Sequence, residues 1–438
     1  MKKVISLLLI SVMLFSTTSC GKKADESASK SDKEGTETQA EKSGKLTIWA
    51  WDPNFNVAIM NEAKTRYQKD NPKVEIEVVD LAKADLEQKL HTNLASGVKE
   101  GLPDIVLIED YNAQKFLKSY PGAFADLTNK INYKDFADYK VSLMTLDGKT
   151  YGVPFDWGVA GLFYRTDYLE QAGYKPEDLN NITWDKFIEI GKKVKEKTGK
   201  AMIGIDPNDG GFIRIMLQSA GQWYFDKDGN PNLANNAVLK EALKVFKTIY
   251  NSGIAKVTNG WDEGCKAFNS GDVASVISGV WMTGSIKAEA SQSGKWRVAP
   301  IPRLNIEGSV NASNLGGSSW YVLDSSKNKD VAIDFLNSIY AKDNDFYQKI
   351  LVSNGAVGTY IPAQSGSAYS QPDEFFSGQK VYSDFSEWMK KIPPINYGQY
   401  TYEADSAIFA LMPDIFSNKL SVDDALKKAE DQLKNQIK

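Results

Sequence analysis

Residues 45–81 read KLTIWAWDPNFNVAIMNEAKTRYQKDNPKVEIEVVDL, and this stretch decides the predicted fold. Its two ends, 45–51 and 73–81, are short apolar runs typical of strands, and residues 56–72 between them have helical spacing. The alternation continues with a helix over 84–97 and a buried strand over 103–110. Strands that alternate with helices in this way predict a mostly parallel sheet covered by helices, which is the α/β class.

The length and charge of the chain restrict its class further. A chain of 438 residues is longer than one hydrophobic core usually serves, so we expect two lobes. The formal net charge of −4 comes from acidic and basic residues that are interspersed, and no nucleic-acid partner is predicted. Ten Trp and twenty Tyr are many for a soluble protein and require an explanation.

The first 44 residues have the composition of an export signal followed by a tether. MKKVISLLLISVMLFSTTSC combines a basic start, an apolar run shorter than the roughly 20 residues of a membrane span, and small residues. It resembles a bacterial lipobox, with a signal over 1–19 and Cys20 as the attachment site of a lipid such as palmitate. A plain secretory signal is the alternative. Residues 20–44 lack aromatic side chains and are predicted to be a disordered tether. The protein is therefore expected outside the cytoplasm, held at the cell membrane by its lipid alone.

Motifs for metal, cofactor or nucleophilic chemistry are missing from the sequence. His91 is the single histidine and has no evident partner, so neither zinc nor Ser-His-Asp chemistry is expected. Nucleotide-binding glycine motifs are absent, and we predict no cofactor and no metal. With Cys20 lipidated, Cys265 has no disulfide partner and is interpreted as a small core residue beside Phe268. DKDGNPN at 226–232 starts like a calcium loop but lacks its final Glu, so it is predicted to be a hairpin turn.

The first candidate ligand contacts follow the predicted strands. In α/β sheets, ligands bind beyond the carboxyl ends of the strands. Trp51 and Asp52 follow the first strand, and Glu109 and Asp110 follow the third. These four residues are predicted to face a ligand.

Eight segments, in this order, resemble the extracellular solute-binding proteins of ABC sugar importers, the maltodextrin-binding-protein-like family 1. They are KLTIWAW (45–51), RYQKDNPKVEIEV (66–78), GLPDIVLIED (101–110), GKTYGVPFDWGVAGLFYRTDYLEQAG (148–173), TWDKFIEIGKKV (183–194), AFNSGDVASVISGVWMTG (267–284), KNKDVAIDFLNSIY (327–340) and SVDDALKKAEDQLKNQIK (421–438). The resemblance covers nearly all of the chain after the tether. It is much less specific for the sugar than for the family.

The resemblance implies a periplasmic-binding-protein-like fold of type II. Two α/β lobes would be joined by a hinge and would close on a ligand in a central cleft. One lobe would comprise 45–154 and 318–365, and the other 155–317 and 366–438. The implied function is that of a monomeric binding protein, not an enzyme, that captures a carbohydrate, an oligosaccharide more than a monosaccharide, and delivers it to the transmembrane subunits of an ABC permease.

The resemblance also implies site residues. YGVPFDW (151–157) would lie at the first crossing between the lobes, with Asp156 accepting hydrogen bonds from sugar hydroxyls and Trp157 packing against the sugar face. Trp157 as a filler of the hinge core is the alternative. Trp281 matches the stacking aromatic of the family, and Gly317 would allow close approach of backbone to ligand. The further candidates, each weighed against a packing role, are Trp223, Trp261 and Trp320, whereas Trp184 and Trp296 are interpreted as framework.

Two other functions remain open at this point. A secreted glycoside hydrolase would also combine carboxylates with aromatic side chains, and it would need two acids roughly 5 to 10 Å apart. A protein of the same fold that binds a peptide, a polyamine or an anion would rely on charge pairing or on a helix N-terminus. The number of aromatic residues in the predicted cleft favours a carbohydrate.

Overall fold

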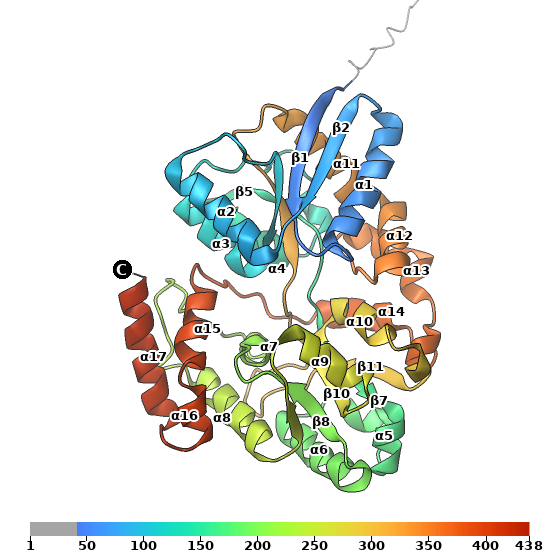
Figure 1. Cartoon of the computed structure of the whole chain (residues 1–438), viewed down its shortest axis with the longest axis vertical. Helices are drawn as coiled ribbons and strands as arrows, with labels where there is room; N and C mark the ends of the chain where they lie inside the picture. Colours follow the sequence, from blue (N-terminus) through green and yellow to red (C-terminus); the bar gives the residue numbers. More distant parts are fainter. Residues whose placement is uncertain (1–41, 438) are drawn as a thin grey trace, which may run out of the picture. The chain divides into compact units, whose positions relative to one another are not determined.

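Two separate five-stranded sheets form the framework of the computed structural model, which describes residues 42–437 (Figure 1). The predicted signal, Cys20 and most of the predicted tether lie outside these residues. The first sheet has the order β2 (Val74–Asp80), β1 (Gly44–Ala50), β3 (Ile105–Glu109), β12 (Ser318–Val322), β6 (Gly152–Pro154). The second has the order β11 (Trp296–Pro300), β7 (Ala160–Arg165), β10 (Val273–Gly279), β8 (Ala201–Ile205), β9 (Ala255–Val257). The fold is therefore α/β with two sheet-containing lobes, as predicted, and we call the lobes of the first and second sheets the N-terminal and C-terminal lobes.

Helices surround both sheets. Those before β6 are α1 (Asn56–Asp70), α2 (Lys83–Ser96), α3 (Asp110–Ser119) and α4 (Asp138–Leu143), and a hairpin of β4 (Thr145–Leu146) and β5 (Lys149–Thr150) follows them. Those between β7 and β12 are α5 (Thr166–Gln171), α6 (Trp184–Thr198), α7 (Gly211–Ser219), α8 (Ala237–Asn251), α9 (Gly260–Asn269) and α10 (Thr283–Lys287). Those after β12 are α11 (Lys329–Tyr340), α12 (Asn344–Asn354), α13 (Ser367–Ser370), α14 (Val381–Met389), α15 (Thr401–Phe409), α16 (Met412–Phe416) and α17 (Val422–Gln436). Within residues 42–437, no helix has both the length and the apolar character that a membrane span requires.

The strands and helices predicted for residues 45–110 are confirmed, with small shifts at their ends. The helix predicted over 84–97 is α2, and it ends where Gly97 takes the left-handed conformation, with φ of 70°, that favours glycine. The strand predicted over 103–110 is β3, and Asp110 begins the next helix instead of ending the strand. The predicted turn at 226–232 is also present, because Phe225 and Pro231 form an antiparallel bridge across it.

The prediction of a mostly parallel sheet holds for only part of each sheet. In the second sheet β8 pairs in parallel with β9 and β10, whereas β7 runs antiparallel to β10 and β11. β1 pairs in parallel with β2 and β3, whereas β12 runs antiparallel to β3 and β6. The physical reason is the path of the chain: β12 arrives from the C-terminal lobe, not through a helical crossover within its own sheet. The local alternation of strands and helices carries no information about such a return.

His91 also differs from expectation, because its Nδ1 contacts the Tyr120 hydroxyl.

The core of the N-terminal lobe follows from the alternation of side chains along its strands. Trp320 and Val322 of β12 point to one face of the sheet, and Tyr321 between them points to the other. The Trp320 ring is fully buried, with its centroid 5.6 Å from that of Phe155 and 5.9 Å from that of Tyr340. This indole therefore belongs to the packed interior of the lobe.

Two segments of the chain run between the two lobes, and a third, which connects α12 to the short 3-10 helix Ile361–Ser365, lies beside them. Residues 155–159 lead from β6 to β7, residues 314–317 lead into β12, and residues 357–359 follow α12. Backbone bonds join them: Trp157 N donates to Val357 O at 3.3 Å, and Leu315 N donates to Gly158 O at 2.6 Å. A Cβ on Gly158 would lie 2.0 Å from Leu315 O, so only glycine permits this approach. We call these three stretches the crossing segments.

The burial of Trp320 leads to a stability prediction. Trp320→Ala should lower the free energy of unfolding by about 3–5 kcal/mol, because it leaves a large cavity in the core. Trp261→Ala is the control, since that indole is 54% exposed and its removal should cost below about 0.5 kcal/mol. Urea unfolding followed by circular dichroism measures both. Equal losses in the two variants would show that Trp320 is not a core residue.

Candidate functional site

Two tryptophans from the C-terminal lobe form an aromatic surface. Trp261 lies in the first turn of α9, and Trp281 lies in a short 3-10 helix, Val280–Met282, directly after β10. Their ring centroids are 5.7 Å apart with 37° between the planes. Trp281 Nε1 donates to Leu315 O at 3.0 Å, which fixes the indole against a crossing segment. Because a Cβ on Gly279 would lie 2.2 Å from Trp281 Nε1, the glycine before the turn is needed for this position.

The two rings line a cavity of about 370 Å³. The cavity also contacts Phe212 and the acidic residues Asp206 and Asp209, and all of its lining residues come from residues 204–315. Its volume falls within the range typical of small-molecule sites, which combine apolar walls with a few polar groups. Cys265 lines the cavity as well and is half-buried, so it differs from the predicted core residue. Burial raises the pKa of its thiol.

The acidic residues of the cavity follow the carboxyl end of β8, which is where ligands bind in α/β sheets. Asp206 Oδ2 accepts a hydrogen bond from Gly260 N at 2.8 Å, which joins the end of β8 to the start of α9. Asp209 Oδ1 accepts from Gly211 N at 2.9 Å, at the start of α7, and the Asp209 side chain is largely exposed. Both carboxylates retain lone pairs for other donors. These two residues and Phe212 were missed by the sequence reasoning, although their place after an apolar strand was the available signal.

Trp51 and Asp52 lie at the carboxyl end of β1, as predicted from the strand pattern. Asp52 has a φ of 64°, and its Oδ1 accepts from Asn54 N at 3.1 Å and from Phe55 N at 3.2 Å. This local turn begins α1 and leaves Asp52 exposed. Trp51 is half-buried, and Lys83 Nζ lies 6.0 Å from the centroid of its ring.

Glu109, at the end of β3, joins the two lobes. Its carboxylate forms an ion pair with Lys83 and accepts a hydrogen bond from the hydroxyl of Tyr402 on α15. Burial favours the neutral acid, but the charge and hydrogen bond of Lys83 and the bond from Tyr402 outweigh it, so the pKa of Glu109 is lowered. The carboxyl edge of the first sheet therefore faces the C-terminal lobe. Lys83 and Tyr402 were not singled out from the sequence. Lys83 follows the end of β2 by three residues, which was an available signal, whereas Tyr402 lies on α15 and carries none.

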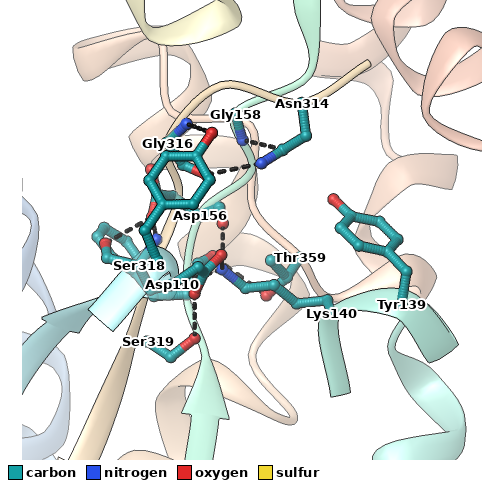
Figure 2. A network of polar contacts seen from close by, with 12 residues as sticks. Asp110, Tyr139, Lys140, Asp156, Gly158, Asn314, Gly316, Ser318, Ser319 and Thr359 are labelled. Carbon is teal, nitrogen blue, oxygen red and sulfur yellow. Dashed lines mark hydrogen bonds and ion pairs between the residues drawn. The ribbon is translucent and has the colours of Figure 1, made fainter. Parts of the chain in front are cut away.

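The structure places the other two predicted carboxylates in a buried network, away from the cavity (Figure 2). Asp110 forms an ion pair with Lys140 of α4, and Asp156 accepts from Ser318 N at 2.6 Å and from Ser318 Oγ at 2.7 Å. Gly317 packs against the same network, since a Cβ there would lie 2.8 Å from Asp110 Oδ2. These residues differ from the expectation of ligand contacts because protein groups already surround them.

Three of the predicted tryptophans are packed in cores and present no free face. Trp157 is buried with its ring 5.9 Å from that of Tyr139, which agrees with the alternative of a core residue. Trp223 is buried with its ring 4.6 Å from that of Tyr397, and its Nε1 donates to Thr401 Oγ1 at 3.0 Å. Trp320 lies in the core described above. Of the predicted aromatic residues, the structure thus brings Trp261 and Trp281 together at the cavity and leaves Trp51 partly exposed at the end of β1.

The sequence of the chain matches a known family and several characterised relatives. The model of the family described as bacterial extracellular solute-binding protein matches residues 62–375 of the chain. The chain belongs to this family. This solute-binding protein is 59% identical over 394 residues to the lactose-binding protein of Rhizobium radiobacter, covering 90% of this chain and 93% of that one. It is 30% identical over 364 residues to the arabinooligosaccharide-binding protein of Bacillus subtilis (strain 168), covering 81% and 79% of the two chains.

A solved structure supports the fold of this solute-binding protein. The GacH receptor of Streptomyces glaucescens GLA.O matches it with a TM-score of 0.76 at 21% identity, covering 90% of this chain and 100% of that one. Likeness at this identity shows the shared fold alone. The two-lobed binding-protein fold predicted from the sequence is thereby confirmed.

Proposed function

We propose that this solute-binding protein binds a carbohydrate, a galactose-containing oligosaccharide such as lactose, and delivers it to the membrane subunits of an ABC transporter. The observation that carries the proposal is the pair Trp261 and Trp281 in a cavity with two carboxylates. The faces of a sugar ring carry C–H groups that pack against indole, and its rim carries hydroxyls that donate to carboxylates. The relative at 59% identity, which is named a lactose-binding protein, supports the choice of sugar.

We further propose that the two lobes close over the sugar, with one lobe of 45–154 and 318–365 and the other of 155–317 and 366–438. The cavity is lined by the C-terminal lobe, so a bound sugar would leave one side open to the N-terminal lobe. The contact of Glu109 with Tyr402 supports the carboxyl edge of the first sheet as the opposing surface. Trp51 and Asp52 share that edge, because β1 pairs in parallel with β3, and they are our candidates for contacts in the closed state.

Titration calorimetry with lactose, arabino-oligosaccharides and maltodextrins tests this function. We expect lactose to bind and to be recovered unhydrolysed, since the relatives are named as binding proteins. Trp281→Ala should weaken lactose binding by about 1–3 kcal/mol, or roughly 5- to 150-fold, because a stacking surface is lost. The control is Trp184→Ala, which removes a buried indole and should lower the melting temperature while sparing affinity. A Trp281→Ala protein that melts early and binds normally would place that ring in the core.

The thiol of Cys265 offers an independent probe of the same cavity. Its alkylation by iodoacetamide, followed by mass spectrometry of the Cys265 peptide at pH 9, should slow when lactose fills the cavity. The alkaline pH is chosen because burial raises the pKa of the thiol, so that little thiolate forms at pH 7. The control is protein unfolded in urea, in which lactose should have no effect. Equal rates with and without a sugar that calorimetry shows to bind would place the site elsewhere.

We also propose that Cys20 carries a lipid that holds the protein at the cell membrane. The support is the sequence MKKVISLLLISVMLFSTTSC, which resembles a lipobox and is followed by a polar stretch. Cys20→Ala should release the protein from the membrane or leave its signal uncleaved, and detergent partitioning of cell fractions measures this. A variant that stays in the membrane fraction with a cleaved N-terminus would rule out the lipid anchor.

A further inference from the structure

A buried lysine stands among the crossing segments. Lys140 lies on α4, and its side chain is 1% exposed. Its Nζ lies 2.5 Å from Asp110 Oδ2 and 2.9 Å from each of two backbone carbonyl oxygens, those of Asp156 and Ser318 (Figure 2). An ammonium group has three N–H donors and no acceptor. Each donor of Lys140 therefore has one oxygen.

The two carbonyls belong to different passages of the chain. Asp156 lies in the first crossing segment, and Ser318 begins β12 directly after the second. The third segment is joined to the first by backbone, because Thr359 N donates to Phe155 O at 3.1 Å. One cation of the N-terminal lobe thus bonds to the first crossing segment at Asp156 and to the residue directly after the second at Ser318, while the third segment is bonded to the first.

This network places charged side chains in the interior, where apolar side chains could fill the same space. Asp110 and Asp156 are both buried, and burial raises the pKa of Asp110 to about 6 against the opposing charge of Lys140. The pKa of Asp156 is raised as well, chiefly by burial. Buried ion pairs are often no more stabilising than apolar residues of similar volume. We therefore look for its role in holding the chain in position and not in stabilising the fold.

The residues that Lys140 holds, Asp156 and Ser318, lie at the ends of the stretches that lead to the C-terminal lobe. Beyond Asp156, Gly158 N donates to Asn314 Oδ1 at 3.1 Å, and the Asn314 amide in turn donates to Gly316 O at 2.7 Å. Gly316 and Gly317 have φ values of 80° and 95°. The stretches between the two sets of bonds are therefore short and rich in glycine, the residue with the widest backbone freedom.

We propose that Lys140 is a positioning residue for sugar binding: it clamps residues 156 and 318 to the N-terminal lobe, so that bending on lobe closure is confined to residues 157–158 and 314–317. The inference rests on the proposed function only in that closure serves the sugar. The clamp itself acts in the empty protein.

Hydrogen exchange of the protein without sugar tests the clamp. Lys140→Met keeps a long side chain but removes all three donors, and the amides of residues 155–157 and 318 should exchange roughly tenfold faster, with the cores unchanged. Lys115→Met is the control, because it makes the same substitution at a partly exposed lysine that also forms an ion pair. Lys115 of α3 pairs with Glu403 of α15 and contacts no crossing segment, so exchange at 155–157 and 318 should stay at the wild-type rate. Wild-type exchange in Lys140→Met would overturn the proposal.

A double variant separates the clamp from charge balance. Asp110→Asn with Lys140→Met removes the unpaired acid, so this protein should melt higher than Lys140→Met alone and folds even if the single variant does not. A clamp predicts that exchange at 156 and 318 stays fast in the double variant and that lactose binding is weakened at least about threefold, because a looser crossing loses more entropy on closure. Restored exchange would mean that Lys140 only neutralises Asp110, which overturns the proposal. Fast exchange in a protein that binds no sugar in any variant would reject the proposed function and keep the clamp.

Discussion

The bonds among the crossing segments are the constraint on which the rest of the structure depends. Each lobe has its own sheet, and the passages of the chain at 155–159 and 314–317 connect the two, with residues 357–359 bonded beside them. Lys140 donates there to the buried carbonyl oxygens of Asp156 and Ser318, and the second of these also accepts from Phe155 N and Asp156 N. The Lys140 ammonium and the Asp110 carboxylate each have hydrogen-bond partners in this interior, which buried polar groups require.

The cavity depends on the same region. Trp281 donates to Leu315 O, so the aromatic surface is attached to a crossing segment and not only to its own lobe. Movement of residues 314–317 would therefore shift one wall of the cavity directly. A ligand that contacts Trp281 and the N-terminal lobe together would bias the crossing segments, since binding shifts a conformational equilibrium by its difference in affinity for the two states.

Local patterns in the sequence were sufficient to predict the strands and helices of residues 45–110 and the polar residues that follow those strands. Trp281 was predicted from its match to the stacking aromatic of the family and from the glycines that flank it, and the structure puts it beside Trp261 at the cavity. Asp206 and Asp209 likewise follow a strand, β8, and were overlooked. The signal for them existed, because a strand end can be recognised from neighbouring residues alone.

The sequence by itself determined the α/β class, the two lobes and the family, because these depend on hydrophobic periodicity and on the order of segments along the chain. Only the tertiary structure decided which aromatic and acidic side chains are free to meet a ligand. Trp157, Trp223 and Trp320 were candidates for sugar contacts from the sequence, yet residues distant in sequence cover their rings. Lys140 meets Asp110 across 30 positions and Ser318 across 178, and no local pattern records such a contact. The physical reason is that burial is a property of what packs against a residue, and those partners are brought together only by the folded chain.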